Sequence, residues 1–195
     1  NLFILSSRGL LAFSKDFNDK TTNFKQIKNN IDQFINLKHF KKLPSFSVKD
    51  LLLFKDKIFV SFTEEIKENC WNTSVIKGDI NYKNINFVKL FSSSECIDSK
   101  NNIDNEFQPL QSGGRIIKYD ESNILLSIGD YRSRQLAQNI NSINGKIIKI
   151  DINNGAFKII SLGHRNPQGL VLDNEKNIIL ETEHGPMGGD EINLI

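Results

Sequence analysis

The two most informative stretches of the sequence are Gly163-His-Arg-Asn-Pro-Gln-Gly169 and Glu183-His-Gly-Pro-Met-Gly-Gly-Asp-Glu-Ile-Asn193. Between them lie two short apolar runs, Gly169-Leu-Val-Leu-Asp173 and Ile178 to Thr182, separated by the polar turn Asn174-Glu-Lys-Asn177. Apolar runs of this length on either side of a turn predict a β-hairpin. Because the two motifs follow successive short strands, we expect both to emerge on the same side of the fold.

The same alternation of short apolar runs and polar turns continues towards the start of the chain. Recurring short strands are typical of an all-β sandwich or barrel-like fold, and hairpin after hairpin favours a β-propeller. Propeller blades have about 40–50 residues, so this chain supplies roughly four blades, and we expect residues 1–195 to form one incomplete propeller domain. The paired runs are residues 2–6 and 10–13, 51–54 and 58–62, 115–119 and 124–128, and 146–150 and 156–162.

One segment, Phe24 to Phe40, has apolar residues at helix-like intervals and therefore predicts a helix. The residues that partly fit this period are Ile27, Ile31, Phe34, Ile35 and Leu37.

The composition excludes several classes of protein. Hydrophobic residues make up 38% of the chain, which is too many for a disordered chain. The formal net charge of +2 gives no electrostatic footprint for nucleic acid or a membrane surface. No apolar run approaches the roughly 20 residues of a transmembrane segment. The chain begins at Asn1 and ends inside the apolar stretch before Ile195, so we expect an excerpt of a longer chain.

The two cysteines, Cys70 and Cys96, bracket one predicted hairpin with strand regions Trp71 to Asp79 and Ile85 to Phe91. Residues equidistant from the turn of a hairpin face each other, so the two sulfur atoms could bond. A pair of unrelated buried thiols is the equal alternative. A bond would indicate an oxidising compartment, either the periplasm or the extracellular space.

The residue types in the two motifs indicate a small-molecule site. The fork of donors on Arg165 suits a carboxylate. The glycines after His184 leave backbone carbonyls uncovered and Asp190-Glu191 adds carboxylates, a donor set suited to Ca²⁺. Taken singly, each piece is more often structural, and His164 and His184 are more often hydrogen-bonded structural residues than metal ligands. Together the motifs suggest an anionic ligand held beside calcium.

Taken as a pair, the two motifs closely resemble the signature of the glucose/sorbosone dehydrogenase family. The resemblance implies a six-bladed β-propeller with pyrroloquinoline quinone (PQQ) and calcium in a pocket on its top face. About two blades would then be missing from the chain. Further matches to the family are Ser112-Gly-Gly-Arg115, Ile128-Gly-Asp130, Asn144-Gly-Lys-Ile-Ile-Lys149 and, in degraded form, Leu5-Ser-Ser-Arg-Gly9.

The resemblance also implies roles for individual residues. Arg165 and Asn166 would bind PQQ, and the backbone carbonyls of Gly185 and Pro186 would ligate the calcium beside it. Glu191 would match a ligand of a second, structural calcium, whose Tyr partner would lie beyond the end of this sequence.

Two positions depart from the family pattern. The family's general base is a His just before the Gly-Arg strand, and Gln111 stands at that place, where an amide cannot accept the proton. The family also places a PQQ-contacting Gln in a Gly-rich segment, which here is Pro44-Ser-Phe-Ser-Val-Lys-Asp50, with neither Gln nor Gly.

Two functions remain open from the sequence. The first is a PQQ- and calcium-dependent dehydrogenase that oxidises aldoses at C1 and passes electrons to an external acceptor in the periplasm or outside the cell. The second is a non-catalytic extracellular propeller that keeps the calcium loop and acts as a binding module. Gln111 and the missing cofactor Gln favour the second for turnover, whereas the Arg165 and Gly185 motifs favour the first.

Overall fold

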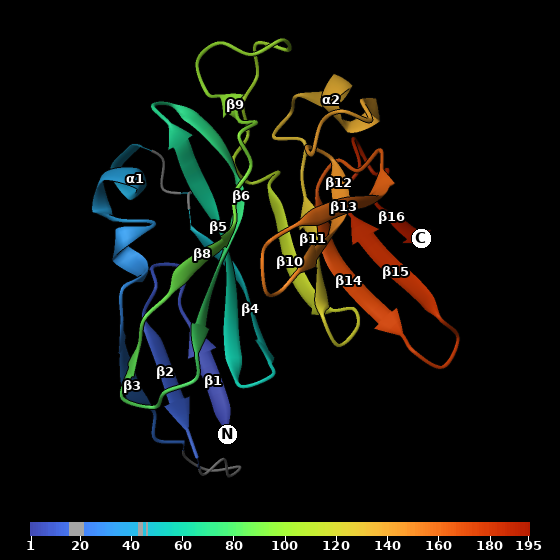
Figure 1. Cartoon of the computed structure of the whole chain (residues 1–195). Helices are drawn as coiled ribbons and strands as arrows, with labels where there is room; N and C mark the ends of the chain where they lie inside the picture. The colour runs from blue at the N-terminus through green and yellow to red at the C-terminus, as the bar shows by residue number, and fades with distance from the viewer. Residues whose placement is uncertain (16–21, 43–44, 46) are drawn as a thin grey trace.

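The computed structural model describes residues 1–15, 22–42, 45 and 47–195 of the chain. In these residues the strands form four β-sheets, which follow one another from the N-terminal sheet at the lower left of Figure 1 to the last sheet at the right. Two short helices, α1 (Leu37–Lys42) and α2 (Arg134–Gln138), and the 3-10 turn η1 (Ile31–Gln33) lie outside the sheets.

Each sheet is built mainly from strands that are consecutive in the chain. The first sheet contains β1 (Leu2–Leu5), β2 (Leu11–Ser14), β3 (Lys25–Asn29) and β7 (Asn84–Ile85). The second contains β4 (Val48–Phe54), β5 (Lys57–Lys67), β6 (Cys70–Asp79) and β8 (Val88–Phe91), with β9 (Ile97–Asp98) paired to β6. The third contains β10 (Gly113–Lys118), β11 (Asn123–Ile128), β12 (Lys146–Asp151) and β13 (Phe157–Leu162). The fourth contains β14 (Pro167–Asp173), β15 (Ile178–Glu183) and β16 (Glu191–Leu194).

The predicted hairpins are confirmed. Each pair of apolar runs forms an antiparallel pair of strands: β1 with β2, β4 with β5, β10 with β11, β12 with β13, and β14 with β15. The four sheets match the number of blades expected from the chain length, although the fourth has three strands instead of four.

The helix predicted over Phe24 to Phe40 is wrong. The segment begins with β3, continues through η1 and reaches helix only at α1. Ile27, Ile31 and Ile35 are at most 2% exposed and join one apolar core, although Ile27 lies in a strand and Ile31 in a 3-10 turn. Their spacing of four residues imitated a helix because a strand and a tight turn in series bring the same residues to one side.

Arg115 joins the first strands of three successive sheets. Its guanidinium lies 3.2 Å from both carboxylate oxygens of Asp50 on β4, and its Nε donates to the carbonyl of Gln168 on β14. The same Asp50 accepts a hydrogen bond from the backbone N–H of Ile116, at 2.9 Å. Strands β4, β10 and β14 therefore lie side by side, as the inner strands of neighbouring propeller blades do.

Apolar side chains fill the spaces between the sheets. One core lies between the first and second sheets, around Phe62 and Trp71, and a second joins the second sheet to the third, around Phe59 and Leu126. A smaller core of Leu125, Ile147, Leu170 and Ile179 joins the third sheet to the fourth. The fourth sheet thus has the least apolar support.

Cys70 and Cys96 form a disulfide, with their Cα atoms 5.3 Å apart. The predicted hairpin is also present, because β6 pairs with β8 in antiparallel fashion. Cys96 lies just before β9, whose residues Ile97 and Asp98 pair with Trp71 and Cys70. Of the two alternatives left open by the sequence, the bonded pair is the one observed.

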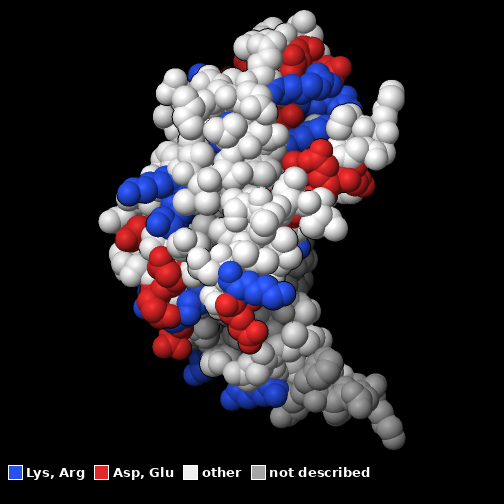
Figure 2. Space-filling model, turned by 90° about the vertical axis from the view of Figure 1, so that its right-hand side faces the viewer, with Lys and Arg blue, Asp and Glu red and all other residues white. Residues whose placement is uncertain are grey.

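The surface agrees with the small net charge. Figure 2 shows Lys and Arg side chains interspersed with Asp and Glu on the face that it presents. None of the described helices is long and apolar enough to span a membrane.

Candidate functional site

The loop that carries the first motif packs against the ends of β10 and β11. The backbone N–H of Asp130 donates to the carbonyl of Arg165 at 2.9 Å, and the N–H of Gly113 donates to Asn166 Oδ1 at 3.2 Å. Asn166 is 5% exposed. Its side-chain oxygen therefore connects two sheets, and this is a structural task in addition to the cofactor contact predicted for it.

Gly145 fixes the start of this loop. Its carbonyl accepts hydrogen bonds from the backbone N–H groups of Gly163 and His164, both at 3.1 Å. Gly145 has a φ of +67°, and a Cβ atom placed on it would lie 2.4 Å from the carbonyl oxygen of His164. Only glycine allows the two backbones to approach so closely.

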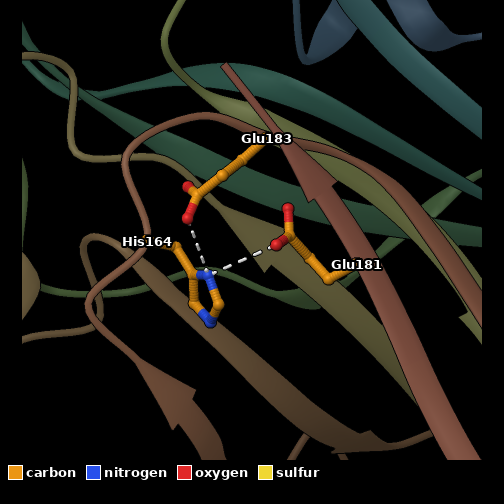
Figure 3. A group of neighbouring side chains, drawn as sticks. All are labelled: His164, Glu181 and Glu183. Atoms are coloured by element: carbon orange, nitrogen blue, oxygen red, sulfur yellow. Dashed lines mark ion pairs between the residues drawn. The ribbon is translucent and has the colours of Figure 1, made fainter. Parts of the chain in front are cut away.

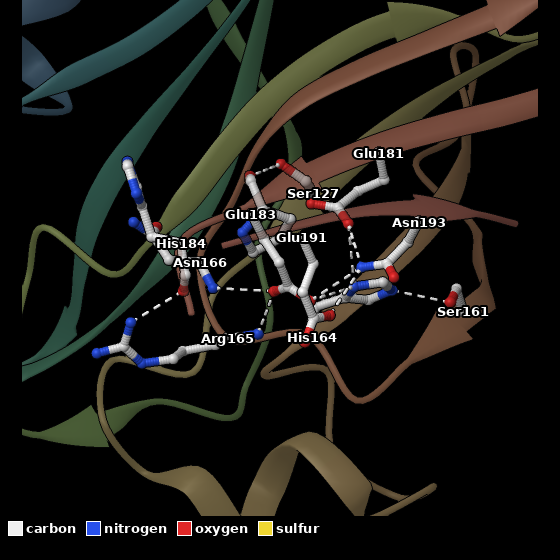
Figure 4. Close-up of polar contacts among 11 residues, drawn as sticks. Ser127, Ser161, His164, Arg165, Asn166, Glu181, Glu183, His184, Glu191 and Asn193 are labelled. Atoms are coloured by element: carbon white, nitrogen blue, oxygen red, sulfur yellow. Dashed lines mark hydrogen bonds and ion pairs between the residues drawn. The ribbon is translucent and has the colours of Figure 1, made fainter. Parts of the chain in front are cut away.

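Arg165 connects the first motif to the second. Its Nη1 donates to the carbonyl oxygen of His184 at 2.9 Å, and its backbone N–H donates to Glu183 Oε2 at 2.5 Å (Figure 4). The same Nη1 also donates to the carbonyl oxygen of Gly185, at 2.8 Å. The structure thus brings together the cation predicted to bind an anionic cofactor and one carbonyl predicted to bind calcium.

The loop of the second motif is tightly folded. A Cβ atom on Gly185 would lie 1.6 Å from the carbonyl oxygen of Gly189, so this position requires glycine. The N–H of Gly185 donates to Asp190 Oδ1 at 3.1 Å, and the N–H of Gly189 donates to the carbonyl of Pro186 at 3.0 Å. Both carbonyls predicted to bind calcium therefore accept hydrogen bonds in this arrangement.

The Arg165 guanidinium and the Gly185 carbonyl fit an anionic cofactor and a calcium ion after one local change, whereas the Pro186 carbonyl keeps its hydrogen bond from Gly189. A carbonyl oxygen that accepts from a guanidinium can accept from a hard cation, since both interactions use the same lone pairs. If the Arg165 guanidinium turned to a carboxylate of the ligand, the oxygen of Gly185 would become available. The structure thus shows the Arg165 guanidinium and the Gly185 carbonyl in direct contact.

Glu191 is exposed at the start of β16. Its Oε2 accepts a hydrogen bond from Asn193 Nδ2 at 3.2 Å. It lines an open pocket of about 420 Å³ on the fourth sheet. The other residues that line this pocket are Gln168, Thr182, Glu183, His184, Asp190 and Ile192.

Gln111 lies at the same end of the third sheet as the first motif. Its carbonyl accepts from the N–H of Tyr131 at 3.0 Å, and Gly113, two positions later, binds Asn166. Gln111 is 8% exposed, and its side-chain oxygen has no hydrogen-bond partner among the described residues. An unsatisfied buried acceptor here suits a ligand hydroxyl as donor.

Asp130 is a candidate that the sequence reasoning did not single out as a site residue. It is 2% exposed, and burial raises the pKa of its carboxyl to about 6 in spite of the N–H of Arg132 and the charge of Arg165. The only sequence signal was its place in Ile128-Gly-Asp130. The structure thus places a carboxyl whose pKa burial raises to about 6 beside the loop of Arg165.

The two histidines of the motifs differ in environment. His184 is exposed and its Nδ1 lies 3.5 Å from Asp190 Oδ2. His164 is 4% exposed, and its Nε2 is 2.8 Å from the hydroxyl of Ser161. Figure 3 shows its Nδ1 facing the carboxylates of Glu181 and Glu183. In the sequence, Glu181 is part of the predicted strand Ile178 to Thr182.

The predicted PQQ-contacting segment is described only in part. Pro44 and Phe46 lie outside the described residues. Lys49, within the same segment, is buried enough for its pKa to fall to about 8.

Parts of the chain are similar in sequence to known proteins. The sequence profile of the family described as Glucose / Sorbosone dehydrogenase matches residues 50–195. Aldose sugar dehydrogenase YliI of Escherichia coli is 34% identical over an alignment of 95 residues that covers 42% of this chain and 26% of that protein. Quinoprotein glucose dehydrogenase B of Acinetobacter calcoaceticus is 31% identical over 112 residues, covering 42% of this chain and 23% of that protein. The matched parts thus span about a quarter of these relatives.

Solved structures resemble almost the whole chain. The apo-form of the soluble aldose sugar dehydrogenase from Escherichia coli superposes with a TM-score of 0.70 at 20% identity, over 98% of this chain and 56% of that one. The PQQ-bound aldose sugar dehydrogenase from Streptomyces coelicolor gives 0.66 at 17% identity, over 96% and 57%. The likeness confirms the predicted fold class, a partial β-propeller, of which this chain supplies a little over half.

Proposed function

The chain belongs to the glucose/sorbosone dehydrogenase family, and from this membership we propose that it is part of a PQQ- and calcium-dependent dehydrogenase that oxidises aldoses at C1. The observation that carries the proposal is the contact between the Arg165 guanidinium and the carbonyl of Gly185. An anionic cofactor and its chelated cation would replace this contact, with Arg165 as the positive group for a carboxylate and the Gly185 carbonyl as an uncharged oxygen ligand for the cation.

Each site residue has a defined task in this proposal. Arg165 would bind a carboxylate of PQQ, and Asn166, held by Gly113, would contact the cofactor from the same loop. The carbonyls of Gly185 and Pro186 would ligate calcium, and Glu191 would ligate a second, structural calcium. When bound, PQQ would serve as the acceptor of two electrons from the sugar, and Ca²⁺ would polarise the quinone. The electrons would then pass to an external acceptor.

The proton of the sugar hydroxyl needs an acceptor other than Gln111. The amide oxygen of Gln111 can hold the hydroxyl by a hydrogen bond but cannot remove its proton. We propose Asp130 for this role, because burial raises the pKa of its carboxyl to about 6 and its own backbone N–H donates to the carbonyl of Arg165. A carboxylate with this pKa is largely ionised at neutral pH and can accept a proton.

The test uses the full-length protein with PQQ and Ca²⁺. We expect aldose-dependent reduction of a dye, and Arg165→Gln should weaken PQQ binding about 10- to 100-fold, since hydrogen bonds to charged groups contribute about 1.5–3 kcal/mol. Arg134→Gln is the control, because Arg134 is an exposed arginine paired with Glu106. Absence of PQQ binding at micromolar cofactor, or equal loss in the two variants, would overturn the proposal.

A second candidate is the non-catalytic extracellular binding module, which the amide at Gln111 favours. It predicts PQQ or sugar binding without dye reduction. Gln111→His then separates the two functions: turnover that appears only in this variant would identify a propeller that has lost its base. Turnover in the unmodified protein, abolished by Asp130→Asn, would support the dehydrogenase.

We also propose a periplasmic or extracellular location. The Cys70–Cys96 disulfide supports it, because structural disulfides persist in oxidising compartments. Cell fractionation with a thiol count on the isolated protein tests this: two free thiols in a cytoplasmic fraction would contradict it.

A further inference from the structure

We propose that His164, Glu181 and Glu183 form a binding site for a first-row divalent cation such as Zn²⁺, with ligands other than those proposed for calcium. Their potential ligand atoms all lie within 4.8 Å of one another. The three residues come from the loop before β14 and from β15, and Figure 3 shows the two carboxylates converging on one edge of the imidazole.

The distances suit a metal better than a direct hydrogen bond. His164 Nδ1 lies 3.4 Å from Glu183 Oε1 and 3.7 Å from Glu181 Oε2. N–H···O hydrogen bonds have separations of about 2.7–3.2 Å. Two ligands at about 2.0–2.1 Å from a tetrahedral cation are about 3.3–3.4 Å apart. Nδ1 has no hydrogen-bond partner among the described residues, although the histidine side chain is only 5% exposed.

Neighbouring groups hold His164 and Glu183 in ligand orientation. His164 Nε2 is 2.8 Å from Ser161 Oγ. When Nε2 carries the proton and donates it to this hydroxyl, Nδ1 has no proton and its lone pair faces the carboxylates. The other oxygen of Glu183 accepts from the backbone N–H groups of Arg165 and Asn166, which turns Oε1 towards the histidine. Such outer contacts are typical of metal ligands.

The negative charge of the two buried carboxylates also favours a bound cation. The side chains of Glu181 and Glu183 are 0% and 7% exposed, and within the described part of the chain neither forms an ion pair with Lys or Arg. Burial raises the pKa of Glu181, and its Oε1 has no partner among the same residues. Buried carboxylates are normally paired or bound to a metal. Because a nitrogen ligand disfavours Ca²⁺, the set selects the zinc class.

Asn193 on β16 provides a fourth position. Its Nδ2 lies 3.0 Å from Glu181 Oε2 and 3.3 Å from Glu183 Oε1, as Figure 4 shows. The nitrogen and oxygen of an amide exchange places when the group rotates by half a turn. In the rotated state Oδ1 would stand at ligand separation from both carboxylates and complete four oxygen and nitrogen ligands.

The test is a titration of the chelator-treated full chain with ZnCl₂, in the presence of millimolar CaCl₂ and without PQQ. We expect one Zn²⁺ per chain by calorimetry, and binding at least about 100-fold weaker in Glu181→Gln and in His164→Gln. X-ray absorption at the zinc edge should report one imidazole. Glu64→Gln is the matched control, because Glu64 is a carboxylate of 9% exposure in the second sheet that accepts from Ser74 and Ser92.

The outcomes separate this site from its rivals. If the trio is instead a protonated histidine between two carboxylates, the unmodified chain takes up no Zn²⁺ and the proposal fails. It also fails if the Glu181 and His164 variants bind zinc as tightly as the Glu64 variant. If both ligand variants misfold, Ser161→Ala tests the proposal instead, because Ser161 orients His164. We expect this variant to bind zinc about tenfold more weakly, and unchanged zinc affinity would contradict the proposal. Since PQQ is absent throughout, failure of the proposed dehydrogenase function would not alter these results.

Discussion

The third and fourth sheets are neighbours but are stabilised by different interactions. In the third sheet, β11 is buried from Ile124 to Ile128, and β12 is almost as deeply buried. In the fourth sheet, β16 is largely exposed, and the interior at its motif end contains Glu181 and His164. The stability that apolar burial supplies changes little with pH, whereas the stability of a region with buried carboxylates changes with their protonation. We therefore expect the third sheet to be the rigid support and the fourth to respond to ligands.

The largest expected effect tests the apolar side of this comparison. Leu126→Ala in the third sheet removes a side chain of 0% exposure and should cost roughly 2–5 kcal/mol of unfolding free energy. Ile179 in the fourth sheet is 7% exposed and belongs to the small core. Ile179→Ala should therefore lower the unfolding free energy by an amount at or below the lower end of this range. Urea unfolding of both variants gives the comparison, and a larger loss at Ile179 would reverse it.

The disulfide gives the next largest effect. Replacing both Cys70 and Cys96 by Ser removes a covalent link between residues 26 positions apart in the sequence. The double variant should lose about 3 kcal/mol of unfolding free energy. The link lies in the second sheet, so hydrogen exchange should increase there and little in β11 and β12. Reductant should shift the melting temperature of the unmodified protein in the same direction and leave the double variant unchanged.

Asp130, at the boundary between the two sheets, gives a smaller and pH-dependent effect. Its folded pKa of about 6 lies above the ordinary value of 3.8, so the folded state loses stability as pH rises from about 4 to 6. Asp130→Asn cannot ionise and should therefore be more stable than the unmodified protein at pH 7.5, by on the order of 2 kcal/mol. Thermal unfolding at pH 4 should show no such gain. A gain that is equal at both pH values would contradict the assigned cause.

The smallest effect is expected at the surface of the third sheet. Lys118 and Glu121 form an ion pair with side chains 48% and 71% exposed. Lys118→Ala should change the unfolding free energy by less than about 1 kcal/mol, and less still in high salt. A loss comparable with that of Leu126→Ala would mean that charge, and not apolar burial, holds this sheet.

Most of the fold could be predicted because hairpins are local. The runs at Ile124 to Ile128 and at Lys146 to Ile150 carry their own strand pattern and turns. The structure of the segment after Phe24 could not be predicted in this way. Ile27, Ile31 and Ile35 reach one core through tertiary packing, and their spacing in the sequence is the same as it would be in a helix.

The candidate site was predictable where the residues stand in a contiguous motif. Arg165 and Gly185 belong to such motifs, and the structure joins them directly. Glu181 was missed because its partner, His164, is distant in sequence and a charged strand residue is usually on the surface. A signal was present nonetheless. Glu181 lies two residues after the buried Ile179 in β15, so both side chains point to the inner face of the sheet.

The close approach at Gly145 has a consequence for how the chain tolerates mutation. Any side chain there would push on the carbonyl of His164, and with it on the whole segment that positions Arg165. A random mutagenesis screen would accordingly record Gly145 as intolerant, although it lies outside both motifs and its contact with the proposed zinc ligand His164 is through the backbone. Drift in the sequences of relatives should be as restricted at this glycine as at the motif itself.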